Sequence, residues 1–289
     1  MANLHLPTLA VVTLPLAGFI VAIISCWGWG IGWAELGLLL GMYVLTVLGI
    51  TIGFHRLFSH RAFETGPVLQ GILAIMGSMA IQGPLLKWVA LHRRHHQHSD
   101  TEDDPHSPHQ GHGMMDVLRG AWHSHVGWFF AADPPDLDRY IRDLRLNPLL
   151  AKISALFPLW VLCSLLIPAL AGWLLTGTWQ GALTGLLWGG LARIFLVHHV
   201  TWSVNSICHL WGGQTFKSGD KSRNNFLMGI LALGEGWHNN HHAFPVSARH
   251  GLKWWQIDIS YWIIRLLALL KLARKVRLPP PSLIASLKA

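Results

Sequence analysis

The chain contains long stretches without a charged side chain, and these constrain its fold more than any other feature. No Asp, Glu, Lys or Arg precedes Glu35, and none lies from Leu36 to His55 or between Lys152 and Arg193. A bilayer crossing requires roughly 20 consecutive apolar residues. Only 12% of the 289 residues are charged, about half the share of a soluble domain. We therefore predict four membrane-spanning helices, at about residues 9–30, 36–55, 154–175 and 180–200.

The basic residues predict the orientation of these helices. Lys and Arg occur in two blocks, one from Arg56 to Lys152 and one from Arg193 to Lys288, whereas residues 1–55 and 173–180 contain neither. By the positive-inside rule, both blocks are cytoplasmic. We expect an all-α membrane protein, a single domain over residues 1–289, with four transmembrane helices and a cytoplasmic helical cap. Because the net charge of +8 is explained by this topology, no nucleic-acid partner is expected.

Histidine is the second unusual feature, since the chain contains 19 of them and many are clustered. Three motifs stand out in the cytoplasmic blocks. Their histidines are His55 and His60, then His92, His95 and His96, and finally His238, His241 and His242. In the last two motifs, spacings of three and four place the imidazoles on one face of a helix. His55 and His60 are separated by roughly 140° on a regular helix, so both reach one site only if the helix ends or unwinds between them.

Clustered imidazoles indicate a metal site, because imidazole binds iron, copper, nickel and zinc well. Eight such ligands are too many for one ion and suit two. Structural zinc sites normally use four ligands, mostly cysteines, whereas the three cysteines of this chain form no paired motif. Two redox-active irons therefore fit better than zinc.

A fifth apolar run, at about residues 65–86, has an ambiguous length. If it crossed the bilayer, the first two histidine motifs would face opposite compartments and could not share a site. We therefore expect this run to form an interfacial or re-entrant helix. Residues 254–277 mix Trp, Ile and Leu with Lys and Arg, which predicts a helix lying along the membrane surface.

The histidine motifs and their flanks resemble those of a known family. The motifs cover residues 55–60, 92–96 and 235–242, and the matching flanks cover residues 104–106, 124–128 and 201–209. In this order they resemble the membrane fatty acid desaturases of the delta-9 type, which include stearoyl-CoA desaturase and bacterial acyl-lipid desaturases. The resemblance extends from about residue 36 to residue 265.

This resemblance implies a site and a reaction. His209 would be a ninth metal ligand, and Asn205 would hold a water bound to one of two iron ions. The reaction would use O₂ to remove two hydrogens from a saturated acyl chain and leave a cis double bond. Electrons would come from a separate ferredoxin or cytochrome b5 docking on the basic cytoplasmic face, in a bacterial inner or thylakoid membrane.

The form and the path of the substrate are further expectations. In the animal enzymes an Arg-Asp pair before the second motif contacts the CoA headgroup, but Ala90 and Leu91 stand at those positions here. We therefore expect the acyl chain to be esterified to a membrane lipid, with acyl-CoA as the alternative. Residues three or four positions apart, counted from His55 back along the second span, share one face of that helix and suggest one wall of a substrate tunnel. Trp202, on the fourth span, is a further candidate. The tunnel candidates are Gly37, Gly41, Val44, Leu48 and Trp202. For the two glycines, helix packing is the role we favour and lining the tunnel is the alternative.

Other interpretations remain open. Histidine-motif hydroxylases and monooxygenases share the metal ligands, and a histidine-rich metal transporter is a more distant alternative, although transport sites favour ionisable groups near mid-span. His98, His106 and His125 are candidate partners for the second nitrogens of the ligands. His198 is expected to lie near the site without ligating a metal, and isolated histidines such as His250 are expected to form surface contacts or hydrogen bonds.

Overall fold

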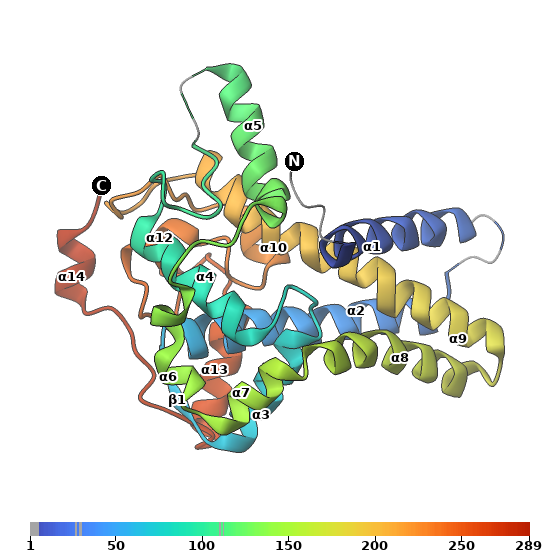
Figure 1. The fold of residues 1–289 in the computed structure, drawn as a ribbon. Helices are drawn as coiled ribbons and strands as arrows, with labels where there is room; N and C mark the ends of the chain where they lie inside the picture. The colour runs from blue at the N-terminus through green and yellow to red at the C-terminus, as the bar shows by residue number, and fades with distance from the viewer. Residues whose placement is uncertain (1–5, 27, 29–30, 110, 112) are drawn as a thin grey trace.

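The computed structural model describes residues 6–26, 28, 31–109, 111 and 113–289. Four long helical segments lie side by side at one end of the molecule, and short helices and loops form a cap at the other end (Figure 1). The long segments are α1 (Leu6–Ser25), α2 (Trp33–Leu48) with its π-helical continuation η1 (Gly49–Ser59), α8 (Phe157–Thr176), and α9 (Trp179–Gly185) continued by η4 (Leu186–Ala192) and α10 (Arg193–Leu210).

The cap is also helical. Its elements are α3 (Pro67–Ser78), α4 (Leu85–His98), α5 (Met114–His125), η2 (Gly127–Phe130), η3 (Leu137–Ile141), α6 (Arg142–Arg145), α7 (Pro148–Ala155), α11 (Phe226–Leu231), α12 (His238–Ala243), α13 (Ile259–Leu269) and α14 (Pro281–Ser286). Within the described residues the sheet is limited to β1 (Glu64–Thr65) and β2 (Ala273–Arg274), which pair antiparallel. The predicted all-α class is confirmed.

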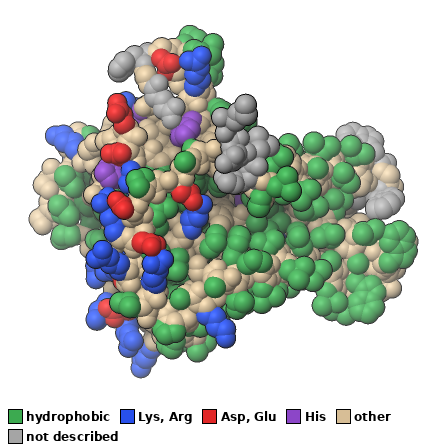
Figure 2. Space-filling view, in the orientation of Figure 1, with side chains coloured by type: hydrophobic (Ala, Val, Ile, Leu, Met, Phe, Trp, Pro, Cys, Tyr) green, Lys and Arg blue, Asp and Glu red, His purple; other side chains and the backbone are tan. Residues whose placement is uncertain are grey.

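Four helices are long and apolar enough to cross a membrane within the described part of the chain. They cover Leu6–Ser25, Trp33–Ser59, Phe157–Thr176 and Trp179–Leu210, so each predicted span is present with shifted ends. The predicted end of the first span, at residues 27–30, falls partly outside the described residues. In Figure 2, hydrophobic side chains cover the end formed by these helices, whereas charged side chains gather over the cap. This distribution is typical of a membrane protein with one polar end.

The ambiguous fifth run does not form a spanning helix. Its helical part, α3, has 12 residues. At 1.5 Å per residue this is about 18 Å, shorter than the roughly 30 Å hydrocarbon core. Gly49 of η1 and Gly77 of α3 lie so close that a Cβ on either would clash with the other helix. This contact holds the end of the second span against α3.

The surface helix predicted at residues 254–277 is shorter than expected. Helix α13 covers Ile259–Leu269 only, and the chain then turns into β2, which pairs Arg274 with Glu64 and Ala273 with Thr65. The pairing uses backbone groups of residues 273–274, so the helix cannot continue through them. The amphipathic pattern was correct for α13 but not for the residues around it.

Candidate metal centre

The nine predicted histidine ligands come together in the cap as two adjacent groups. The first histidine group contains His55, His60, His92, His96 and His241, and the second contains His95, His209, His238 and His242. Within each group the nearest ring nitrogens all lie within 4.8 Å of one another. The structure therefore brings all nine predicted residues together, and it divides them five to four.

The π-helical end of the second span explains how His55 and His60 reach the same place. Segment η1 is an 11-residue π-helix, and the His60 N–H donates to the His55 carbonyl oxygen at 3.1 Å. This i to i+5 hydrogen bond is the π pattern, which stacks residues five apart. The two rings lie 4.8 Å apart between centroids. The predicted irregularity is present, although the helix widens before it ends.

Two short helices each contribute to both groups. On α4, His92 and His96 are one turn apart and join the first group, while His95 points to the second. On α12, His238 and His242 join the second group and His241 the first. Adjacent positions on a helix point about 100° apart, so one helix can supply ligands to two neighbouring sites. His209, from the end of α10, completes the second group.

The ring nitrogens are arranged for a cation in each group. In the first group, His241 Nε2 lies 3.0 Å from His55 Nε2 and 2.9 Å from His96 Nε2. In the second group, His95 Nε2 and His242 Nε2 are buried without a hydrogen-bond partner among the described residues. Buried polar atoms normally have a partner. Converging imidazole nitrogens without one fit a transition-metal ion, which takes imidazole readily.

Four carboxylates hold the other nitrogen of four of these rings, and sequence reasoning did not identify them as a set. Glu235 lies 2.6 Å from His55 Nδ1, and Asp104 lies 3.0 Å from His95 Nδ1. Asp100 lies 3.0 Å from His209 Nδ1, and Asp220 lies 2.5 Å from His242 Nδ1. A carboxylate on Nδ1 fixes the tautomer and leaves the Nε2 lone pair free for a metal. Asp104 lies in the matching flank at residues 104–106 and Glu235 in the motif at residues 235–242, but no sequence pattern indicated Asp100 or Asp220.

Electrostatics favour the charged carboxylate in two of these pairs and the neutral ring at two other histidines of the site. Burial opposes ionisation of Asp104, but the charge and hydrogen bond of His95 outweigh it, so the pKa of Asp104 is lowered well below its usual value. The pKa of Asp220 is lowered in the same way, with His242 outweighing burial. Burial lowers the pKa of His92 and of His241 well below normal, so both are neutral at physiological pH. Neutral imidazole is the form that binds metals.

A buried ionic contact places the third motif against the second span. Arg56, fully buried in η1, donates to Asp258 Oδ1 at 2.9 Å and to the Ala248 carbonyl oxygen at 3.1 Å. Its Nη2 also lies 3.2 Å from Glu235 Oε1 and 3.1 Å from His250 Nδ1. His250 is therefore a buried member of this network, not a surface residue, and its ring packs 4.4 Å from that of His241.

The histidines expected to support the ligands have different roles. The His106 ring packs 4.4 Å from the His95 ring, so it lies beside the site. His98 Nδ1 lies 3.9 Å from Asp103, and His125 contacts His199 at 2.9 Å, so among the described residues neither is the Nδ1 partner of a ligand. His198 lies outside both groups and donates to backbone carbonyls.

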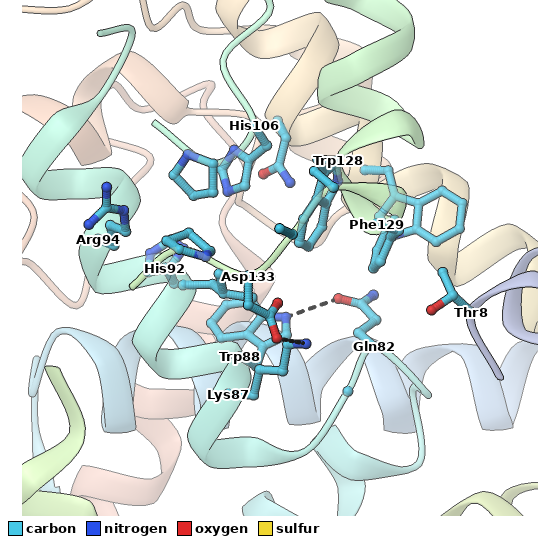
Figure 3. Close-up of a pocket in the computed structure, with 18 of the residues that line it drawn as sticks. Thr8, Gln82, Lys87, Trp88, His92, Arg94, His106, Trp128, Phe129 and Asp133 are labelled. Atoms are coloured by element: carbon cyan, nitrogen blue, oxygen red, sulfur yellow. Dashed lines mark hydrogen bonds and ion pairs between the residues drawn. The ribbon is translucent and has the colours of Figure 1, made fainter. Parts of the chain in front are cut away.

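A cavity of about 570 Å³ opens beside the first histidine group, where His92 forms part of its wall. Large aromatic side chains line much of it, among them Trp88, Trp128, Phe129 and Trp202 (Figure 3 labels the first three). This volume is typical of a site for an organic ligand. Asn205 also lines the cavity, one helical turn before His209 on α10.

Only one of the five tunnel candidates, Trp202, lines this cavity. Gly37, Gly41 and Val44 are exposed on α2, and a Cβ built on either glycine meets no described atom within 4 Å. Leu48 packs against the main hydrophobic core and is also absent from the described cavity wall. The structure therefore gives no support to a tunnel wall along α2. The tunnel candidates on α2 were chosen by counting steps of three or four residues from His55 through η1. Because η1 is π-helical, residues at these steps do not lie on one face of the helix.

Comparison with known proteins agrees with this site. The family model for fatty acid desaturases matches residues 27–271. A hex-5-enoyl-[acyl-carrier protein] acetylenase of Moorena producens is 45% identical over 278 residues, covering 95% of this chain and 87% of that protein. An sn-1 stearoyl-lipid 9-desaturase of Anabaena variabilis is 41% identical, covering 85% of each chain. An icosanoyl-CoA 5-desaturase of Limnanthes douglasii is 37% identical, covering 90% of this chain and 69% of that protein. The chain is an enzyme that belongs to the fatty acid desaturase family.

Proposed function

We propose that this enzyme is a di-iron, O₂-dependent desaturase that introduces a cis delta-9 double bond into a saturated acyl chain esterified to a membrane glycerolipid. The observation that carries the proposal is the pair of histidine groups beside an aromatic-lined cavity. Iron bound by the nine imidazoles would supply the O₂ activation that removal of hydrogen from an unactivated methylene requires, since no acid or base can remove it.

The chain's own residues would position the substrate. The cavity wall combines the indoles of Trp88 and Trp202 with Leu91, an apolar lining suited to a methylene chain and to the exclusion of water. Trp88 stacks on His92 with ring centroids 5.0 Å apart, so the wall is continuous with the first histidine group. A chain held against this wall would present a fixed pair of carbons to the metals.

The polar groups around the cavity favour a lipid ester over acyl-CoA. Ala90 is buried in the core and Leu91 lines the cavity, so neither can bind a phosphate. The cations nearby already have carboxylate partners: Lys87 Nζ lies 2.7 Å from Asp133, as Figure 3 shows, and Arg94 lies 3.3 Å from Asp103. A CoA site needs cations that are free to pair with several phosphates.

The proposal also includes a partner and an orientation. The cap would face the cytoplasm, by the positive-inside rule, in a bacterial inner or thylakoid membrane. An external ferredoxin or cytochrome b5 would dock on its basic surface and supply electrons, steered by opposite charge.

The test is a product analysis with three forms of the same acyl chain. Iron-loaded enzyme, with a ferredoxin or cytochrome b5 system as donor, is given stearoyl glycerolipid in vesicles, stearoyl-CoA, or stearoyl acyl carrier protein. The carrier-protein arm is included because the acetylenase named above is described as acting on such a substrate. We expect 9-octadecenoyl lipid to form fastest. Turnover of either thioester with intact lipid untouched would contradict the lipid assignment, and a hydroxylated chain as sole product would contradict desaturation.

A further inference from the structure

We propose that His198, which touches neither histidine group, is a positioning residue that fixes where along the acyl chain the double bond forms. This inference rests on the proposed function. His198 lies on α10, and its side chain is 1% exposed. It acts on the segment between α3 and α4, which we call the 79–84 turn.

The 79–84 turn is held by two side chains of one neighbouring span, α10. His198 Nε2 donates to the Ala80 carbonyl oxygen at 3.0 Å and to the Ile81 carbonyl oxygen at 3.1 Å. Arg193 Nη1 donates to the Met79 carbonyl oxygen at 3.1 Å. Three consecutive carbonyls therefore accept hydrogen bonds from side chains on α10, which satisfies backbone acceptors of buried residues.

The turn needs such support because its backbone is strained. Ile81 has a φ of +58°, a conformation that β-branched residues rarely adopt. No glycine or asparagine at this position relieves the strain, so contacts from outside must keep the turn in place. His198 provides them at the strained residue itself.

The next residue makes the turn part of the substrate cavity. Gln82 Nε2 donates to Thr201 Oγ1 at 2.5 Å, and Gln82 Oε1 accepts from Trp88 Nε1 at 3.2 Å. All three side chains line the cavity, and Figure 3 shows the bond between Gln82 and Trp88. Because Trp88 stacks on His92, a series of direct contacts runs from the 79–84 turn to the first histidine group.

His198 also contacts a cavity-lining residue on its own helix. Its ring stacks on Trp202 with centroids 4.8 Å apart, and Trp202 lines the cavity. One side chain thus sets the distance between the turn that carries Gln82 and the helix that carries Thr201 and Trp202. The depth at which an acyl chain passes the metals depends on this wall, so loosening it should allow other carbon pairs to react.

The experiment compares four variants of the full-length, iron-loaded enzyme. His198→Leu removes both hydrogen bonds, and His198→Gln keeps a donor at a similar reach. His199→Leu is the matched control, because the His199 ring also packs against Trp202 and contacts His125, but the hydrogen bonds to the turn come from His198. The double variant His198→Leu/Ile81→Gly removes the backbone strain, since glycine adopts positive φ without cost.

Two measurements are made. Mass spectrometry of the products gives the position of the double bond. Backbone amide hydrogen exchange measures how often the 79–84 turn opens, and it requires no substrate turnover. For His198→Leu we expect about a tenfold rise both in products with a displaced double bond and in exchange at the turn, as expected when buried carbonyls lose their donor. His198→Gln and His199→Leu should match the wild type, and Ile81→Gly should restore His198→Leu toward it.

The outcomes separate the two proposals. Unchanged double-bond position or unchanged exchange in His198→Leu would overturn the role of His198. If His198→Leu does not accumulate, accumulation of the double variant supports the strained-turn account, and failure of both overturns it. A wild-type enzyme that forms no double bond contradicts the proposed function. The exchange measurement would still test whether His198 stabilises the 79–84 turn.

Discussion

Substitution of Asp104 by Asn should weaken metal binding in the second histidine group alone. The Asp104 side chain is fully buried, and both of its oxygens lie 3.0 Å from His95 Nδ1. It also accepts hydrogen bonds from the backbone N–H groups of Asp100 and His106. Asparagine has nearly the same shape, but it lacks the charge that fixes the His95 tautomer, and its amide group replaces one acceptor with a donor.

The size of the effect follows from this contact. Loss of a carboxylate partner behind a metal-binding imidazole typically weakens metal affinity about 10- to 100-fold, or about 1.4–2.7 kcal/mol. Asp104 contacts His95 and no ring of the first group, so we expect one of the two irons to be lost first. Iron per chain is measured after dialysis against a graded chelator. Asp104→Asn should fall from about two irons to about one at a 10- to 100-fold lower chelator concentration than the wild type.

Asp103→Asn is the matched control for this experiment. Asp103 precedes Asp104 in the chain, but its side chain is 68% exposed and pairs with Arg94 at 3.3 Å. Its substitution should leave the iron content unchanged, because an exposed pair contributes little. The reasoning is refuted if Asp104→Asn retains both irons at the wild-type chelator concentration, or if the control loses iron equally.

Three further predictions concern topology, metal removal and chain length. Reporter fusions after residues 60 and 220 and at the C-terminus should report the cytoplasm, and a fusion near Gly177 should report the opposite side. If the fusions after residues 60 and 220 report opposite sides of the membrane, the histidines cannot share a site. Complete removal of iron should abolish desaturation and lower the Tm, because bound metal stabilises the folded state, and Fe²⁺ but not Zn²⁺ should restore activity. Gly41→Leu should leave the chain-length preference unchanged, because Gly41 is exposed with open space around it; a shift to shorter chains would return α2 to the tunnel wall.

The spans and the histidine ligands could be predicted from the sequence because both depend on local patterns. Absence of charge over 20 residues is enough to predict a crossing. Spacings of three and four on α4 and α12 are enough to place imidazoles on neighbouring faces. The shared site then followed from the requirement that all motifs lie on one side of the membrane.

Two of the carboxylate partners, Asp100 and Asp220, could not be predicted, because their contacts with histidine are distant in sequence. Asp100 and His209 are 109 positions apart, and Asp220 and His242 are 22 apart. No periodicity relates such pairs, so only the tertiary fold reveals them.

The tunnel wall predicted along α2 does not coincide with the described cavity, for a local reason. The stripe through Gly41 and Gly37 assumed a regular pitch from His55, but the helix is π-helical from Gly49 to Ser59. A π-helix has more residues per turn than an α-helix, so steps of three or four from His55 do not stay on one face through η1. The cavity lies instead among α4, η2 and α10, near the start of α1.

Anomalous X-ray scattering at the iron edge, from crystals of enzyme produced with iron, tests the central claim most directly. The account predicts two peaks per chain, one among His55, His60, His92, His96 and His241 and one among His95, His209, His238 and His242. A single peak shared by all nine rings, or iron bound outside both groups, would contradict it.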